Sequence, residues 1–207
     1  MLQSFTRRAA MALTGVGAFM FARPATASVA TPRQTAGPFY PPPRMRPSDT
    51  DWDLVRVAGR VRAAGGEVLH LFGEVLDLDG TPVPNALVEI WQCDVNGRYH
   101  HDGDTGEGRP KDEGFQGFGA VRTGVDGTYR FRTIKPVAYP GRTPHIHARV
   151  VPPDGRELIT QLYLLDEPLN DRDFIFRSLG EAGQAAVTID PVTRGDGDLE
   201  AGFNFVI

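Results

Sequence analysis

Two histidines and a tyrosine fall within one short stretch of this 207-residue chain. His145 and His147 are two positions apart, and Tyr139 precedes them by six. Side chains at positions i and i+2 of a β-strand share a face, so a strand here would direct both imidazoles to one side. Two neutral imidazole nitrogens and a phenol oxygen that converge on one point can hold a metal ion.

A second tyrosine, Tyr99, follows another strand-like segment and offers a second phenolate. Tyrosine has a reference pKa of about 10, so a highly charged cation is needed to keep its side chain deprotonated at neutral pH. Two phenolates and two imidazoles therefore suit ferric iron better than zinc. The sequence predicts a non-haem Fe(III) centre with the ligands Tyr99, Tyr139, His145 and His147.

The segments that must position these residues have the pattern of short strands separated by turns. Strands are predicted at residues 70–76, 86–92, 121–123, 128–131, 145–151, 157–164, 185–189 and 202–207. Asp126-Gly127 is a hairpin signal, and residues 152–155 form a Pro- and Gly-containing turn. Only residues 171–179 have a helical pattern. This spacing favours an all-β fold, an antiparallel β-sandwich, with long functional loops at residues 94–120 and 134–144.

The first 60 residues differ from this pattern. Residues 1–27 contain Arg7-Arg8, then a moderately apolar stretch, then small residues before Ser28, which predicts a signal peptide. The paired arginines favour the twin-arginine route, which exports folded proteins, and thus a periplasmic location; a general secretory signal is the alternative. Residues 28–60 are rich in proline and predict an extended N-terminal arm that folds over a preformed body. Residues 61–207 would then be the catalytic domain.

Composition excludes several classes of protein. The formal net charge is -4, and no run of Lys and Arg indicates nucleic-acid binding. No stretch of 18 or more apolar residues follows the N-terminal segment, so no membrane association is expected after signal removal. Cys93 is the only cysteine, which excludes an internal disulfide, and we expect it to be a small buried side chain.

A set of ordered motifs resembles the intradiol ring-cleavage dioxygenases, in particular the protocatechuate 3,4-dioxygenase type. The resemblance covers residues 31–207. The matching positions are Thr35, Gly37 to Tyr40, Leu71, Gly73, Val75, Gly80, Val83, residues 88–92 and 97–99, Gly127, Tyr129, residues 131–136, Tyr139-Pro140, Arg142, residues 144–147, Gln161 and Tyr163.

The resemblance implies a role for each site residue. Tyr99, His145 and His147 would stay on the iron, whereas Tyr139 would leave it when substrate binds. Arg142 would lie beside the bound catechol and stabilise negative charge on its ring. Gln161 and Trp91 would line the substrate pocket. The substrates would be a catechol-type molecule and O2, and a chain with all four ligands resembles the iron-bearing subunit of relatives that pair with an iron-free one. A homo-oligomer and a hetero-oligomer both stay open.

The sequence departs from the family in the segment between Tyr139 and His145, which is shorter than in many relatives and lacks their tryptophan. Two other functions compete with ring cleavage. The first is a β-sandwich that captures aromatic molecules at a retained metal site without turnover. The second is a zinc hydrolase built on His145 and His147, against which stand the missing third conventional ligand and the two tyrosines.

Overall fold

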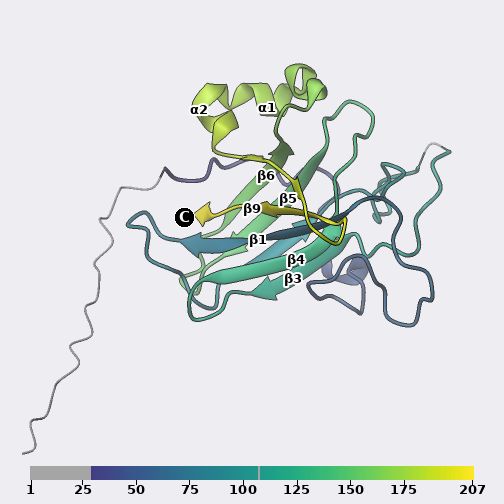
Figure 1. Ribbon diagram of the computed structural model, residues 1–207, viewed down its shortest axis with the longest axis horizontal. Helices are drawn as coiled ribbons and strands as arrows, with labels where there is room; N and C mark the ends of the chain where they lie inside the picture. The colour runs from purple at the N-terminus through teal and green to yellow at the C-terminus, as the bar shows by residue number, and fades with distance from the viewer. Residues whose placement is uncertain (1–28, 107) are drawn as a thin grey trace, which may run out of the picture.

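The computed structural model describes residues 29–106 and 108–207, which form two five-stranded sheets (Figure 1). The predicted signal peptide, residues 1–27, lies outside the described residues. No helix in the described ranges is long and apolar enough to cross a membrane.

The first sheet is built around β1 (Val68–Leu76). β4 (Thr128–Ile134) pairs with one edge of β1 in antiparallel orientation. β9 (Leu199–Gly202) and β10 (Phe205–Val206) follow one another along the other edge and run parallel to β1, and β8 (Val192–Thr193) pairs with β9. The C-terminal residues therefore complete this sheet.

The second sheet carries the residues singled out above. Its strand order is β3 (Phe118–Arg122), β2 (Leu87–Trp91), β5 (His145–Val151), β6 (Leu158–Leu164) and β7 (Thr188–Ile189). After β6 the chain forms three short helical segments, η2 (Pro168–Arg172), α1 (Phe174–Ser178) and α2 (Gly180–Ala185); a further 3-10 turn, η1, spans Pro43–Met45. Figure 1 shows α1 and α2 beyond the end of β6.

Side chains alternate along β2 and β5 between two faces of the second sheet. One face packs in the core, and the other, which we call the functional face, carries His145 and His147. Val88 and Ile90 of β2 and Ile146 of β5 join one hydrophobic cluster with Leu69 and Leu71 of β1, so both sheets share one core. Such sharing is what a sandwich requires. The residues between them in sequence point to the opposite face of the second sheet, because side chains alternate along a strand.

The functional face carries two rows of residues that are in register across the strands. Trp91, His147 and Gln161 form one row. Glu89 and Arg149 form part of the next row. This arrangement places one predicted ligand between two residues that the sequence assigned to the pocket.

The N-terminal arm covers this face. Gln34 donates from its backbone N–H to the carbonyl of Ile159 (2.7 Å), along the edge of β6. Farther on, Tyr40 packs its ring against Trp91, with centroids 4.8 Å apart. Residues 34–40 thus lie over the second sheet, before η1 begins.

Three expectations about the strands need correction. The sheets are mixed, because β1–β9, β1–β10 and β6–β7 are parallel pairs. Asp126-Gly127 lies in a turn, but the turn does not close a hairpin, since β3 pairs with β2 and β4 pairs with β1. The predicted strand at residues 185–189 is reduced to Thr188–Ile189, because α2 extends to Ala185.

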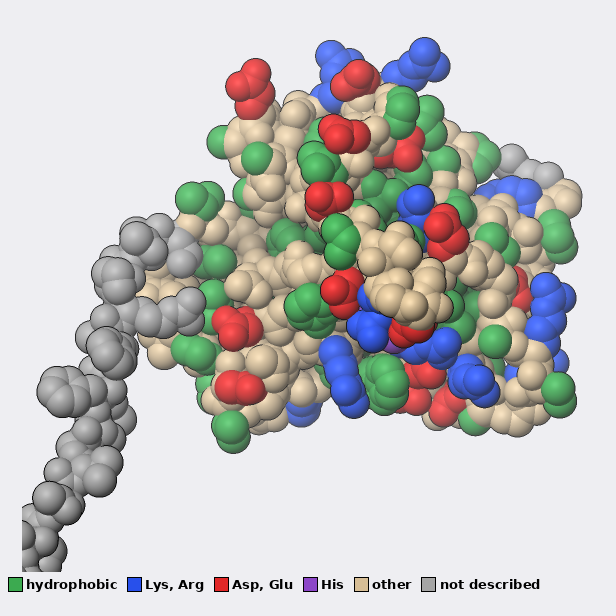
Figure 2. All heavy atoms as spheres, viewed as in Figure 1, with side chains coloured by type: hydrophobic (Ala, Val, Ile, Leu, Met, Phe, Trp, Pro, Cys, Tyr) green, Lys and Arg blue, Asp and Glu red, His purple; other side chains and the backbone are tan. Residues whose placement is uncertain are grey.

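Charged side chains of both signs are interspersed on the face in Figure 2. That distribution agrees with the modest net charge.

Candidate metal centre

The structure brings the four predicted ligands together. The Nε2 atoms of His145 and His147 are 3.1 Å apart, and the Tyr99 hydroxyl lies 3.5 Å from His145 Nε2. The Tyr139 ring centroid is 5.4 Å from that of Tyr99 and 5.6 Å from that of His145. Four side chains from three segments of the chain therefore converge on one place.

Local structure explains why each side chain points there. His145 begins β5, and His147 follows on the same face. Tyr99 lies in the loop after β2, where its backbone N–H donates to Asp104 Oδ2 (2.8 Å). Tyr139 is held by a tight turn in which Arg142 N–H donates to its carbonyl (3.0 Å). The short 139–145 segment thus keeps the phenol beside the start of β5.

His147 is enclosed from two sides. The Trp91 ring stacks on its imidazole with an interplanar angle of 6° and a centroid distance of 4.8 Å. From the arm, the backbone of Gly37 approaches so closely that an added Cβ would lie 3.4 Å from His147 Cε1. Gly37 has a φ of +67°, a conformation that favours glycine. Trp91 therefore supports a predicted ligand directly.

The protonation states suit a strongly charged cation. His145 Nδ1 is 2.6 Å from the Thr143 carbonyl and must donate to it, so its Nε2 carries a lone pair. Burial lowers the pKa of His145 to about 4, with the positive charge of Arg142 acting in the same direction. Burial also lowers the pKa of His147 well below its usual value. Both imidazoles are thus neutral at pH 7, as metal ligands must be.

The two tyrosines test more strictly than the histidines which kind of metal ion suits the site. Burial raises the pKa of Tyr99 well above 10, and burial also raises the pKa of Tyr139, although Arg142 opposes this second shift. The protein alone therefore keeps both as phenols, and only a nearby cation of high charge would make them phenolates. Within the residues that the structure describes, His147 Nδ1 is buried and has no hydrogen-bond partner. The donor set fits Fe(III) and fits a divalent ion less well.

No group of three or more His, Cys, Asp or Glu side chains in residues 29–106 and 108–207 could hold a metal ion. A conventional zinc site of such residues is therefore missing from the described part of the chain. His100 and His101 are neighbours of Tyr99 in sequence but make other contacts: His100 packs edge-on to Phe115, and His101 Nδ1 accepts from Gly103 N–H.

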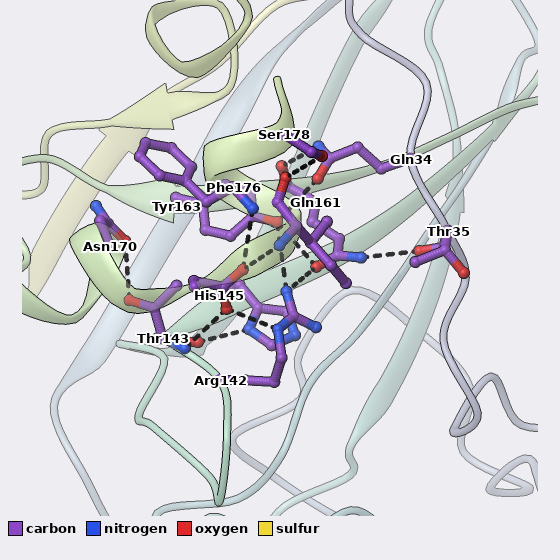
Figure 3. A network of polar contacts seen from close by, with 12 residues as sticks. Gln34, Thr35, Arg142, Thr143, His145, Gln161, Tyr163, Asn170, Phe176 and Ser178 are labelled. Carbon is purple, nitrogen blue, oxygen red and sulfur yellow. Dashed lines mark hydrogen bonds and ion pairs between the residues drawn. The ribbon is translucent and has the colours of Figure 1, made fainter. Parts of the chain in front are cut away.

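Arg142 and Gln161 belong to a polar network that Figure 3 shows around His145. Arg142 donates from Nε to Asp173 Oδ2 (2.7 Å) and from a terminal nitrogen to Gln161 Oε1 (2.6 Å). Gln161 in turn donates to the Thr35 carbonyl of the arm (2.9 Å). Gln161 thus accepts a hydrogen bond from Arg142 and orients its guanidinium. A contact between Gln161 and substrate stays a prediction.

Asp173 is a site residue that the sequence did not reveal. Its side chain is fully buried. It accepts from Arg142 Nε and Thr143 N–H through Oδ2, and it caps α1 by accepting from Ile175 and Phe176 N–H through Oδ1. One carboxylate therefore joins the predicted catalytic arginine to the helix that follows β6.

Replacing Asp173 by asparagine should destabilise the protein by about 3 kcal/mol, because the buried guanidinium of Arg142 loses its counter-charge. In either orientation, the amide nitrogen would also face a pair of N–H donors from which a carboxylate oxygen accepts in the wild type. Denaturant unfolding measures the loss. Asp171→Asn, an exposed change in η2, is the matched control, and equal stabilities for the two variants would contradict the role of Asp173.

A second buried carboxylate, Glu89, fastens the arm to the sheet. Its two oxygens accept from Arg46 (3.1 Å) and Arg149 (2.9 Å), and the Tyr40 hydroxyl donates to it as well (2.7 Å). Tyr40 is the residue that packs against Trp91. The contacts therefore run from Glu89 through Tyr40 and Trp91 to His147.

Glu89→Gln should lower the free energy of unfolding by roughly 2 to 3 kcal/mol. This loss is at the low end of the range for breaking a buried ion pair, because Arg46 and Arg149 are both partly exposed. Glu157→Gln removes the exposed partner of the same Arg149 and should cost no more than about 1 kcal/mol. Urea unfolding of both variants compares the two. A Glu157→Gln loss as large as that of Glu89→Gln would show that Glu89 does not fasten the arm.

Cys93 is buried, and burial raises the pKa of its thiol to about 12. Its Sγ lies 3.5 Å from the Val137 carbonyl. This agrees with the expected small buried side chain and makes a reactive thiolate at neutral pH implausible on chemical grounds.

Comparison with known proteins identifies relatives of this arrangement. A family model described as "Dioxygenase" matches residues 36–207. The protocatechuate 3,4-dioxygenase beta chain of Burkholderia cepacia is 41% identical over 142 residues, which is 65% of this chain and 60% of that protein. The catechol 1,2-dioxygenase of Acinetobacter baylyi is 30% identical over 204 residues, 84% of this chain and 59% of that protein. The matches thus span about three fifths of these curated relatives.

Among solved structures, the dioxygenase domain of a dioxygenase–carbohydrate-binding protein fusion from Streptomyces sp. SirexAA-E superposes with a TM-score of 0.67. It is 31% identical, and the alignment covers 86% of this chain and 98% of that domain. The likeness therefore extends over nearly the whole of a separately solved domain.

Proposed function

The chain belongs to the intradiol ring-cleavage dioxygenases, and we propose that it opens catechol-type rings, protocatechuate or a related compound, to muconate-type diacids. The reaction breaks the bond between the two hydroxyl-bearing carbons and places both atoms of O2 in the product. It therefore needs no external reductant.

The observation that carries this proposal is the convergence of two phenols and two neutral imidazoles beside a buried arginine. A hydrolase would need an open divalent site with conventional ligands, which the donor set does not favour. A dioxygenase that keeps its metal ferric needs hard anionic donors, and Tyr99 and Tyr139 would supply them.

Tyr99, Tyr139, His145 and His147 would hold the iron. Bound there, Fe(III) would lower the pKa values of a catechol and draw electron density from its ring, which prepares the ring for attack by oxygen.

The protein side chains have separate tasks. Tyr139 is the more accessible of the two tyrosines, and its phenolate oxygen would accept one of the two protons that the catechol loses on binding. The Arg142 guanidinium stays charged at any working pH and stabilises negative charge on the ring. Asp173 and Gln161 hold it in place. Trp91 and the arm keep water from His147.

Oxygen uptake in the presence of catechols tests the proposal. Iron-loaded protein should consume one O2 per catechol, and the product mass should equal catechol plus O2. The competing aromatic-binding function predicts that catechols bind, as seen by calorimetry, with no oxygen uptake. That result would reject the enzymatic proposal.

We also propose that residues 1–27 direct export of the folded, metal-loaded protein to the periplasm by the twin-arginine route. Replacing Arg7 and Arg8 together by lysine should retain the protein in the cytoplasm. Export of that variant at the normal level would favour the general secretory route.

A further inference from the structure

A cavity of about 270 Å³ opens beside the candidate metal centre, on the side of Tyr139 and Arg142. η2 also contributes to its lining, through Leu169 and Arg172. Tyr139 is the one proposed ligand among its lining residues. The cavity has room for a small aromatic molecule, so a ring placed against Tyr139 and Arg142 would lie in the same cavity as Arg172 of η2.

The charges around this cavity do not balance. Arg142 is neutralised by Asp173, and Asp173 has no further capacity because it also accepts from Thr143 N–H and caps α1. Arg172 is exposed and forms no salt bridge within the part of the chain that the structure describes. The cavity wall therefore carries one positive charge without a protein counter-charge.

The backbone of Arg172 is held in place on both sides. Asn170 donates to the Leu164 carbonyl (2.9 Å) and accepts from the Thr143 hydroxyl (2.8 Å), which ties η2 to the 139–145 segment. Asp173 N–H donates to the Asn170 carbonyl (3.2 Å). Hydrogen bonds thus fix the backbone that carries the Arg172 side chain. Arg172 is also one residue from Asp173, whose carboxylate orients Arg142.

We propose that Arg172 determines substrate specificity by binding an anionic substituent, such as a carboxylate, on the catechol ring. The inference rests on the proposed ring-cleavage function and names a residue that distinguishes among its substrates. A guanidinium binds a carboxylate through charge-assisted hydrogen bonds, which a neutral substituent of similar size cannot provide.

Two substrates of similar shape isolate this charge: protocatechuate and its methyl ester. With the wild-type chain, protocatechuate should have the higher kcat/KM, by about tenfold, the value of one charge-assisted contact of an exposed side chain. Arg172→Gln should remove that preference through KM with little change in kcat. Arg172→Glu should reverse it. Dissociation constants measured without oxygen should change in the same way, which separates binding from turnover.

Arg177→Gln is the matched control, because Arg177 is exposed on α1 and lies outside the cavity lining. It should keep the wild-type preference. If Arg172→Gln consumes oxygen with an unchanged ratio between the two substrates, the role of Arg172 is wrong and ring cleavage stands. If the wild type consumes oxygen with neither substrate nor with catechol, the proposed function itself fails, and this inference fails with it.

Discussion

His147→Ala should abolish both iron binding and oxygen uptake. His147 is fully buried in the centre of the donor set, with its Nε2 3.1 Å from that of His145 and its ring clamped by Trp91. Loss of residues that merely orient a ligand already costs about 10- to 100-fold in metal affinity, so loss of a ligand should exceed that. Metal analysis after iron loading gives the result.

His101→Ala is the control for this change. His101 lies two residues from Tyr99 in sequence, yet its ring nitrogen accepts from Gly103 N–H rather than facing the centre. The control should bind one iron per chain and keep its activity. Iron loss in His101→Ala together with normal loading of His147→Ala would show that the ligands are wrongly assigned.

Arg142→Lys should lower kcat by roughly 10²- to 10³-fold, the usual cost of removing one group that stabilises developing negative charge. The guanidinium contacts Asp173 and Gln161 at the same time, and a lysine ammonium cannot span both with the same planar fork. Iron content should stay near one per chain, because Arg142 is not a proposed ligand. Stopped-flow turnover and metal analysis on the same sample separate the two effects.

Arg177→Lys, an exposed change on α1, should leave both quantities unaltered. An iron-loaded Arg142→Lys variant with wild-type kcat would remove Arg142 from the mechanism. Loss of iron from that variant would instead mean that Arg142 supports the metal site.

The convergence of the four side chains was predictable in part because it depends on local geometry. His145 and His147 share a face since they are two residues apart in β5, and the short turn after Tyr139 returns the chain to that strand. The strands around them alternate clearly between apolar and polar residues, as Val88, Glu89 and Ile90 do. Tyr99 was a candidate because it follows a strand-like segment, although it is 46 residues from its contact His145.

Features that depend on distant contacts were not predictable. Asp173 lies 31 residues from Arg142, within a segment whose pattern indicated only a short helix. Glu89 lies 60 residues from Arg149 and 43 from Arg46, so its role emerges only when arm and sheet meet. The hairpin prediction at Asp126-Gly127 was wrong for a related reason. Local turn chemistry does not determine whether the flanking strands pair with each other or enter two different sheets.

The most direct test of the ferric centre is the visible absorption spectrum of the iron-loaded protein, recorded with Tyr99→Phe and Tyr139→Phe beside it. Two tyrosinate ligands predict a coloured wild-type protein whose charge-transfer band weakens and shifts in each variant and changes when a catechol is added. A colourless wild-type protein that retains stoichiometric zinc would contradict the account.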